Sequence, residues 1–191
     1  MSIAHVITAF GLAGAAGLNA YIPLLLVAVA GRLGFIALTA PFDRLSSWPA
    51  IIALAVLLLV EMVVDKVPGA DHVNDVVQTF VRPAAGAVLF AANTGVIQGM
   101  DPTIGLIAGL VMALTVHGAK ASARPVINLS TMGLGAPVIS VVEDVTSIVA
   151  SFLAVFAPVM FIVFAAVVVF VVVRLLRRIR RKAGRSGIQV A

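Results

Sequence analysis

Two glutamates lie in stretches of the sequence that are otherwise almost entirely apolar: Glu61 and Glu143 each follow a valine within such a run. A charge near the centre of a bilayer costs at least about 2.5 to 3.5 kcal/mol on insertion scales, so it must face a protein interior or water and needs partners. We interpret Glu61 and Glu143 as carboxylates that carry a proton or an ion. The alternative is that both are counter-ions that hold helices together.

A stripe of polar residues leads up to an arginine. Its members follow one another at steps of 4, 3 and 4 residues: Asp71, Asp75, Gln78 and Arg82. Residues three and four apart share one face of a helix, so the stripe predicts a polar face that lines an ion pathway. Arg82 lies too far along its helix to belong to a solvated helix start. We therefore expect it to have a carboxylate partner on another helix, with Glu61 as the first choice.

Two aspartates flank the link between these elements. Asp65 follows Glu61 by one helical turn, and Asp71 opens the stripe. We predict that both are gating residues or ion ligands, although Asp71 could also be a solvated helix start favoured by the macrodipole. A third hypothesis is a membrane enzyme that holds Mg²⁺ with Asp65, Asp71 and Asp75. We favour an enzyme least, because the sequence contains only one such acidic motif.

A basic stripe follows later in the chain. His117, Lys120 and Arg124 are spaced by 3 and 4 residues. We predict that they contact an anionic head group or a phosphate. The alternative is that the positive-inside rule alone accounts for Lys120 and Arg124.

A helix break is predicted near the start of the chain. Asn19 and Tyr21 stand beside Pro23 in an apolar segment rich in small residues. Broken helices in transporters expose backbone carbonyls to ions, which is the role we predict for this segment. Helix–helix contact is the alternative.

Residues for other chemistry are sparse. The three histidines lie on separate segments, and the chain has no cysteine. Disulfides, thiolate chemistry and zinc–thiolate sites are therefore excluded. We expect neither a catalytic set nor a metal or cofactor.

The elements that position these residues must be membrane helices. Of the 191 residues, 62% are hydrophobic and 11% charged, whereas a soluble domain has about 45 to 50% apolar and about 25% charged residues. The mean hydropathy is +1.17. A soluble enzyme and a disordered chain are excluded, and an all-α polytopic transmembrane helix bundle is predicted.

Apolar runs and the Gly and Pro residues between them predict six spans. Their approximate ranges are residues 3–30, 49–66, 72–98, 103–123, 136–156 and 158–173, with Pro125 ending the fourth. Six spans put both termini in the cytoplasm, because most basic residues then share that side and only Arg32 and Arg44 lie outside. A single kinked helix through residues 156–158 would instead give five spans and reverse the N-terminus.

The basic residues are concentrated at the C-terminus. Seven of the 13 lie between Arg174 and Arg185, so we divide the chain into a bundle, residues 1–173, and a basic cytoplasmic tail, residues 174–191. Such a tail after an apolar span meets anionic lipid head groups. We expect no nucleic-acid partner, because no folded basic surface or aromatic platform accompanies the run.

A faint internal symmetry is present. Residues 17–23 and 118–125 both combine small residues, a polar insertion and a proline, and the span after each carries a carboxylate next to valine. Three spans per half is an odd number, so this pattern predicts two inverted three-helix repeats, with binding near their interface.

Three stretches resemble the motifs of the uncharacterised bacterial integral-membrane family DUF4126: residues 17–25, 65–71 and 82–86. The resemblance covers roughly residues 5–170. It implies a small multi-pass protein of the bacterial inner membrane and no particular reaction. It also marks Asn19, Asp65, Asp71 and Arg82 as motif positions.

Together these patterns favour a transporter or channel-like protein for a small or anionic solute. A structural or assembly protein whose buried charges fix helix packing is the alternative. In either case we expect the bilayer as surroundings and association into a homo-oligomer.

Overall fold

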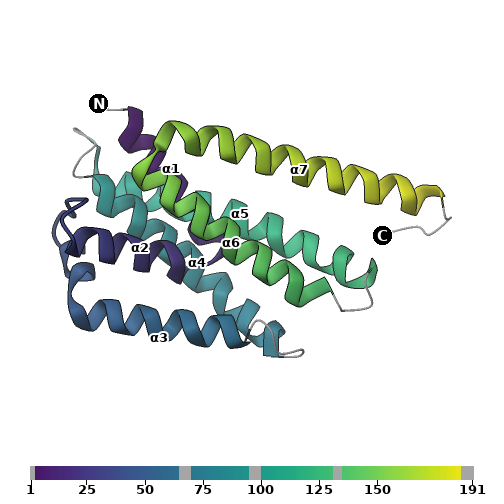
Figure 1. Cartoon of the computed structure of the whole chain (residues 1–191), viewed down its shortest axis with the longest axis horizontal. Coiled ribbons are helices and arrows are strands. Elements are labelled where there is room, and N and C mark those ends of the chain that lie inside the picture. The colour runs from purple at the N-terminus through teal and green to yellow at the C-terminus, as the bar shows by residue number, and fades with distance from the viewer. Residues whose placement is uncertain (1–2, 65–69, 95–99, 131–134, 186–191) are drawn as a thin grey trace.

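The computed structural model describes residues 3–64, 70–94, 100–130 and 135–185, and this part of the chain is helical without any strand. The elements are α1 (Ile3–Leu18), α2 (Tyr21–Arg32), the short 3-10 helix η1 (Phe42–Ser46), α3 (Trp48–Val64), α4 (Ala70–Thr94), α5 (Pro102–Ser130), α6 (Gly135–Phe156) and α7 (Pro158–Arg185). They form one elongated bundle (Figure 1). The predicted all-α bundle is confirmed.

Two helices extend beyond their predicted bounds. The prediction that Pro125 ends a helix is wrong, because α5 continues to Ser130, just as α4 continues through Pro83. Neighbouring helices and polar side chains can satisfy the backbone groups that a proline frees inside a membrane bundle. The last helix, α7, passes residue 174 without a break, so the basic segment extends it as far as Arg185.

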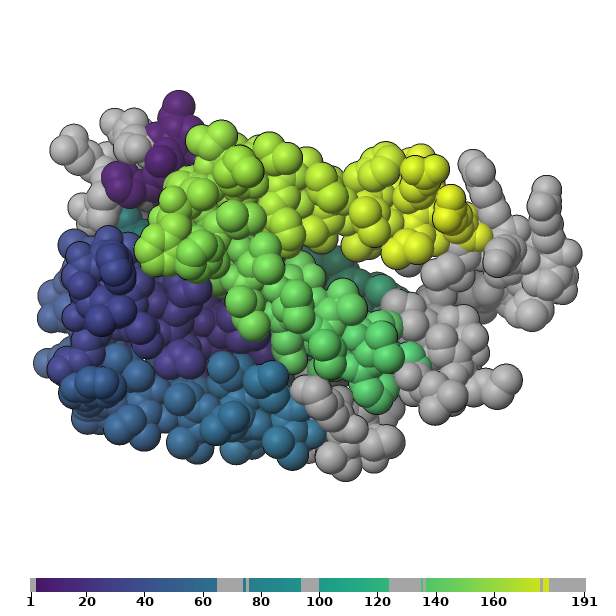
Figure 2. Space-filling view, viewed as in Figure 1, coloured from purple at the N-terminus to yellow at the C-terminus, as the bar shows by residue number. Residues whose placement is uncertain are grey.

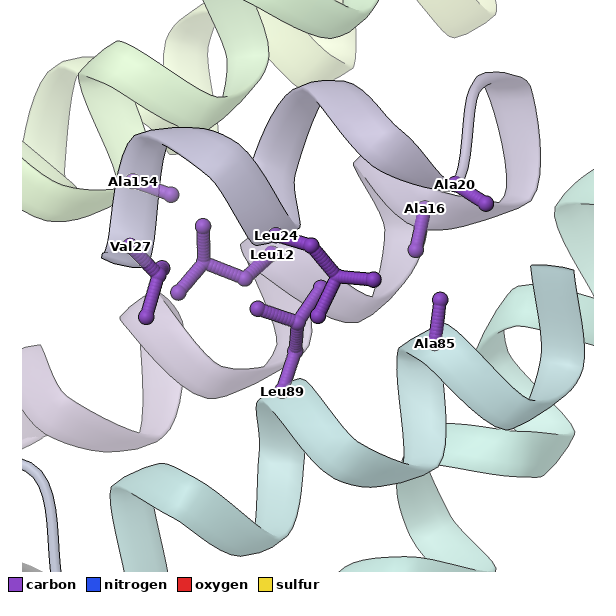
Figure 3. Close-up of a cluster of buried hydrophobic side chains, with 8 residues drawn as sticks. All are labelled: Leu12, Ala16, Ala20, Leu24, Val27, Ala85, Leu89 and Ala154. Atoms are coloured by element: carbon purple, nitrogen blue, oxygen red, sulfur yellow. The ribbon is translucent and has the colours of Figure 1, made fainter. Parts of the chain in front are cut away.

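The segment predicted as one first span is a helical hairpin. The chain reverses between the end of α1 at Leu18 and the start of α2 at Tyr21 (Figure 1). Leu12 and Leu24 therefore lie in one apolar cluster (Figure 3), although twelve residues of continuous helix would separate them by about 18 Å. With 16 and 12 residues, each helix is shorter than the roughly 20 residues needed to cross a hydrocarbon core. The hairpin is re-entrant: it enters the bundle and returns to the same end.

This hairpin changes the topology. The five helices α3 to α7 run along the bundle in alternating directions, so the N- and C-terminal ends lie at opposite ends of it (Figure 1). Among the described residues, three segments are long and apolar enough to cross a membrane by length and composition, namely Pro102–Ala123, Pro137–Phe156 and Pro158–Leu175. Both termini lie on one side only if the chain has six full spans. The first predicted span is instead a hairpin that returns to the end of the bundle where it began.

Small residues let the other helices approach α1 at the centre of the bundle. Ala9, Ala13 and Ala16 are fully buried. In membrane bundles such residues allow close contact between backbones. The closest approach of α4 and α5 is at Gly86 and Gly109, where a Cβ on either residue would meet the backbone of the other helix.

Replacing Gly109 by alanine is expected to destabilise the protein by about 1 to 3 kcal/mol, the usual range for overpacking. The added methyl group would meet the carbonyl oxygen of Gly86, which cannot move without shifting α4. Gly118→Ala is the matched control, because Gly118 is on the same helix and no atom of the described residues lies within 4 Å of its Cβ position. Thermal melting in detergent measures both variants. An unchanged melting temperature for Gly109→Ala would contradict the close approach.

The exterior of the bundle is strongly apolar. Large hydrophobic side chains such as Phe80, Val138 and Val159 are mostly exposed. Monomeric soluble proteins rarely expose contiguous apolar surface on this scale. The exterior is therefore suited to contact with lipid.

Candidate functional site

Polar side chains from five elements meet inside the bundle in what we call the central polar layer. Its members come from the hairpin tip and from α3, α4, α5 and α6: Asn19, Tyr21, Glu61, Gln78, Arg82, His117, Lys120, Glu143, Asp144 and Ser147. Only 0% of Arg82, 2% of Glu61 and 1% of Asn19 is exposed. Ionisable residues buried at membrane depth are candidates for function by default.

The central polar layer lies well inside the bundle. Arg82 and Asp144 each precede the end of their helix by 12 residues, and His117 follows the start of its helix by 15. These three helix ends share one end of the bundle (Figure 1). At a rise of about 1.5 Å per residue, the three residues lie about 18 to 22 Å from that end. A hydrocarbon core is about 30 Å thick, so a bundle that spans it with this end at one surface would hold the layer within it.

Arg82 joins α3, α4 and α5. Its Nη2 donates to Oε1 of Glu61 at 3.1 Å, and its Nη1 donates to Nδ1 of His117 at 3.1 Å. The ring Nε2 of His117 lies 3.2 Å from Oγ1 of Thr79. The predicted pairing of Arg82 with Glu61 is confirmed.

These contacts define the protonation state of His117. A guanidinium only donates hydrogen bonds, so Nδ1 of His117 must accept and carries no proton. The ring is therefore neutral, with its proton on Nε2 facing Thr79. Here His117 supports Arg82 as an acceptor and adds no positive charge to the basic stripe.

Lys120 caps the C-terminal end of α1 at the helix break. Its Nζ donates to the carbonyl oxygen of Leu18 at 3.1 Å and lies 2.7 Å from Oε2 of Glu143. A cation at a helix C-terminus is favoured by the macrodipole. The Ser147 hydroxyl donates to the carbonyl of Ala15 at 3.1 Å. Lys120 of α5 thus satisfies the Leu18 carbonyl at the break, and Ser147 of α6 adds a second hydrogen bond to the Ala15 carbonyl, which also accepts from the Asn19 N–H.

Asn19 closes the start of α2. Its Oδ1 accepts from the backbone N–H groups of Tyr21 and Ile22 at 3.0 and 3.1 Å, and its Nδ2 donates to Oδ1 of Asp144 at 2.9 Å. The first N–H groups of a helix have no intrahelical partner, and an asparagine side chain is well suited to accept from them. Pro23 fits the same turn, since its missing N–H would be one of these groups. The helix is broken within the segment where the sequence predicts a break.

Two buried polar atoms of α4 have no hydrogen-bond partner among the described residues: Nε of Arg82 and Oε1 of Gln78. Gln78 precedes Arg82 by one helical turn, and its side chain also hydrogen-bonds the Tyr21 side chain. An unsatisfied buried polar group costs about 1 to 3 kcal/mol. One small polar molecule that both accepts and donates would satisfy the two atoms together.

The structure brings together most of the residues singled out in the sequence. Glu61, Arg82, His117, Lys120 and Glu143 all belong to the central polar layer, together with the hairpin-tip residues. One candidate, Asp65, lies outside the described residues. Two others, Asp71 on α4 and Arg124 on α5, have described helix positions but no described side chains.

The sequence analysis placed Gln78 in the polar stripe, but its selection of site residues did not include Asp144 and Ser147. Asp144 directly follows Glu143, and neighbouring residues of a helix point about 100° apart. Both carboxylates reach the interior because α6 packs between two partners: Glu143 meets Lys120 of α5, while Asp144 meets Asn19 of the hairpin. The signal in the sequence that could have identified Asp144 is the pair of adjacent acidic residues, Glu143 and Asp144, in an otherwise apolar run.

The predicted inverted repeat is not supported. Residues 17–23 contain the hairpin turn, whereas α5 passes through residues 118–125 without a break. The physical difference is that Asn19, Lys120 and Ser147 satisfy the interrupted backbone of the first segment. Small residues followed by proline are not enough to break a helix.

The metal hypothesis rests on Asp65, Asp71 and Asp75, whose side chains lie outside the described residues. Elsewhere, among the described residues, no three His, Asp or Glu residues lie close enough to hold a metal ion.

Fold and site together define a class of protein: an all-α bundle with an apolar exterior, whose buried charges surround the tip of a re-entrant hairpin. The family model described as Domain of unknown function (DUF4126) matches residues 6–178, and the chain belongs to this family. The match spans the whole central polar layer. No curated protein and no solved structure matches the chain.

Proposed function

We propose that the protein is a membrane transporter for a small anion, coupled to a proton, and that the central polar layer is its binding site. The observation that carries this proposal is the fully buried Arg82, paired with Glu61 beside the hairpin tip. Removing two charges from water costs several kcal/mol per ion, and replacing such a pair by apolar residues is often neutral or stabilising. The pair is therefore poorly explained by stability alone. A binding site that exchanges a proton and an anion gives these two charges a function.

Proton binding and anion binding support each other at this pair. In the ion pair, the Glu61 carboxylate neutralises the Arg82 guanidinium. A proton on Glu61 removes that neutralisation and leaves Arg82 free to attract an anion. An anion on Arg82 favours protonated Glu61 by the same free energy, because coupling between two binding events is reciprocal. Lys120 and Glu143 form a second pair of the same kind.

The unsatisfied atoms beside the pair indicate the class of anion. Nε of Arg82 can donate to a negatively charged oxygen, and Oε1 of Gln78 can accept from a hydroxyl group. A small oxyanion that still carries a proton has both groups. We therefore assign this class of solute to the site.

The re-entrant hairpin is the element suited to move. Its tip is tied to α5 and α6 by the bonds of Lys120, Asp144 and Ser147. Two of these three residues are charged, so a change of charge in the layer alters how firmly the tip is held. Transporters place broken helices at such sites near the bilayer midplane.

The direct test uses purified protein in liposomes that contain a pH-sensitive dye. An inward proton gradient should drive uptake of a radiolabelled small oxyanion that carries a hydroxyl group, such as hydrogen phosphate or bicarbonate, and an inward anion gradient should acidify the lumen. Protein-free liposomes are the control. A wild-type protein that moves neither protons nor any anion of a broad panel would contradict the proposal.

A structural role is the second candidate, because the same ion pairs join helices. Glu61 and Arg82 connect α3 to α4, and Lys120 and Glu143 connect α5 to α6. In this case the central polar layer fixes the packing of the helices and transports no solute.

We further propose the bacterial inner membrane as location, with the C-terminal end of the bundle in the cytoplasm. The basic segment of α7 belongs there by the positive-inside rule. The N-terminal end then lies outside, together with Arg32 and Arg44.

Single cysteines in this cysteine-free chain test the orientation. Asp43→Cys and Asp101→Cys, at the N-terminal end of the bundle, should react with an impermeant thiol reagent in intact cells. Arg185→Cys should react only after the cells are opened. Labelling of Arg185→Cys from outside would reverse the topology, and equal labelling at both ends would show mixed orientation.

A further inference from the structure

One face of α7 changes from apolar to basic along a single helical stripe. Its members, spaced by three or four residues and by one at the end, include Ile162, Ala166, Phe170, Arg174, Arg177 and Arg178. This spacing keeps them on one side of the helix. The guanidinium of Arg174 lies 5.7 Å from the centre of the Phe170 ring, a cation–π contact at the boundary between the two parts.

The stripe forms one wall of an open groove of about 1110 Å³. From their turn at Ala157, α6 and α7 diverge (Figure 2), and the described residues that line the groove all belong to α7. The apolar part of the wall runs from Ile162 to Val173, a length of about 16 Å at the usual helical rise. One leaflet of a hydrocarbon core is about 15 Å thick. The groove thus matches an acyl chain in length and places the arginines at head-group level.

We propose that this groove binds an anionic phospholipid of the cytoplasmic leaflet. An acyl chain lies along the apolar wall, where Ala165 and Ala166 leave room, and the phosphate contacts Arg174, Arg177 and Arg178. Guanidinium groups bind phosphate through charge-assisted hydrogen bonds with matching planar geometry. This inference is independent of transport through the central polar layer.

The arginines favour a lipid over a second copy of the chain. Two α7 helices packed side by side in the same orientation would bring their arginine groups together, and like charges repel strongly where water is scarce. A lipid phosphate instead neutralises them. Charge complementarity therefore selects the occupant.

The experiment titrates full-length protein in an uncharged detergent with phosphatidylglycerol, phosphatidylcholine or inorganic phosphate. Native mass spectrometry counts bound lipids, and the melting temperature is followed in parallel. Phosphatidylglycerol should bind and raise the melting temperature. In Arg177→Gln with Arg178→Gln, affinity should fall roughly 30-fold, since each basic residue near an anionic surface contributes about fivefold.

Two further variants distinguish lipid binding in the groove from non-specific attraction of the lipid to basic residues. Arg32→Gln with Arg44→Gln removes the same charge from the opposite end of the bundle, away from the groove, and should keep the lipid. Ala166→Phe fills the groove without changing charge and should lose it. Equal losses in both double variants, equal binding of both lipids, or the same stabilisation by inorganic phosphate alone would overturn the proposal. A lipid-free mass of two chains would replace it with a dimer.

Discussion

Replacing Arg82 with alanine is expected to lower the free energy of unfolding by about 3 to 5 kcal/mol, the usual cost of removing one member of a buried ion pair. The carboxylate of Glu61 would stay buried without its guanidinium, and Nδ1 of His117 would lose its donor. Denaturation of the detergent-solubilised protein measures the change.

The double variant tests whether the two residues are energetic partners. Arg82→Ala with Glu61→Gln should be less destabilised than Arg82→Ala alone, because the carboxylate is no longer charged. Asp101→Asn is the control second substitution: Asp101 is exposed at the start of α5, so its effect should simply add to that of Arg82→Ala. If the effects of Arg82→Ala and Glu61→Gln on the free energy of unfolding also simply add, the two residues have no energetic coupling.

Glu61→Gln is expected to reduce proton-coupled anion flux to the rate of protein-free liposomes while the protein remains folded. The amide has nearly the shape of the carboxyl group and can still accept from Arg82, but it cannot exchange a proton. Flux under an imposed pH gradient and melting temperature should be measured on the same preparations.

Two outcomes separate transport from a structural role. Asp101→Asn removes an exposed carboxylate outside the central polar layer and should transport like the wild type. If Glu61→Gln transports at the wild-type rate, Glu61 carries no proton in the cycle. If Glu61→Gln is markedly less stable and the wild type moves nothing, the structural alternative replaces the transporter.

Much of the central polar layer could be predicted because charge burial is costly. Glu61 and Arg82 stand out in their sequence surroundings, and their opposite charges and depths in successive helices suggest the pair. The pairing of Lys120 with Glu143 was one of several combinations that the same argument allowed. Which side chains meet depends on helix rotation, and the apolar pattern of a membrane helix fixes that rotation poorly.

The hairpin could not be predicted as a reversal. Residues 3–30 are long and apolar enough to read as one span, and a helix break at Asn19 is compatible with either a kink or a turn back. The groups that stabilise the turn, Lys120, Asp144 and Ser147, are on helices far along the chain. The continuation of α5 past Pro125 has the same origin, since neighbours rather than local sequence decide how a proline is accommodated.

The hairpin also bears on how the protein is made. Helices α1 and α2 are each too short to be inserted as a span, and the side chains that hydrogen-bond their hairpin come 102, 125 and 132 residues later in the chain. At about 5 to 20 residues per second, that is a delay of several seconds or more. The hydrogen bonds that hold the hairpin can therefore form only after α5 and α6 have been made.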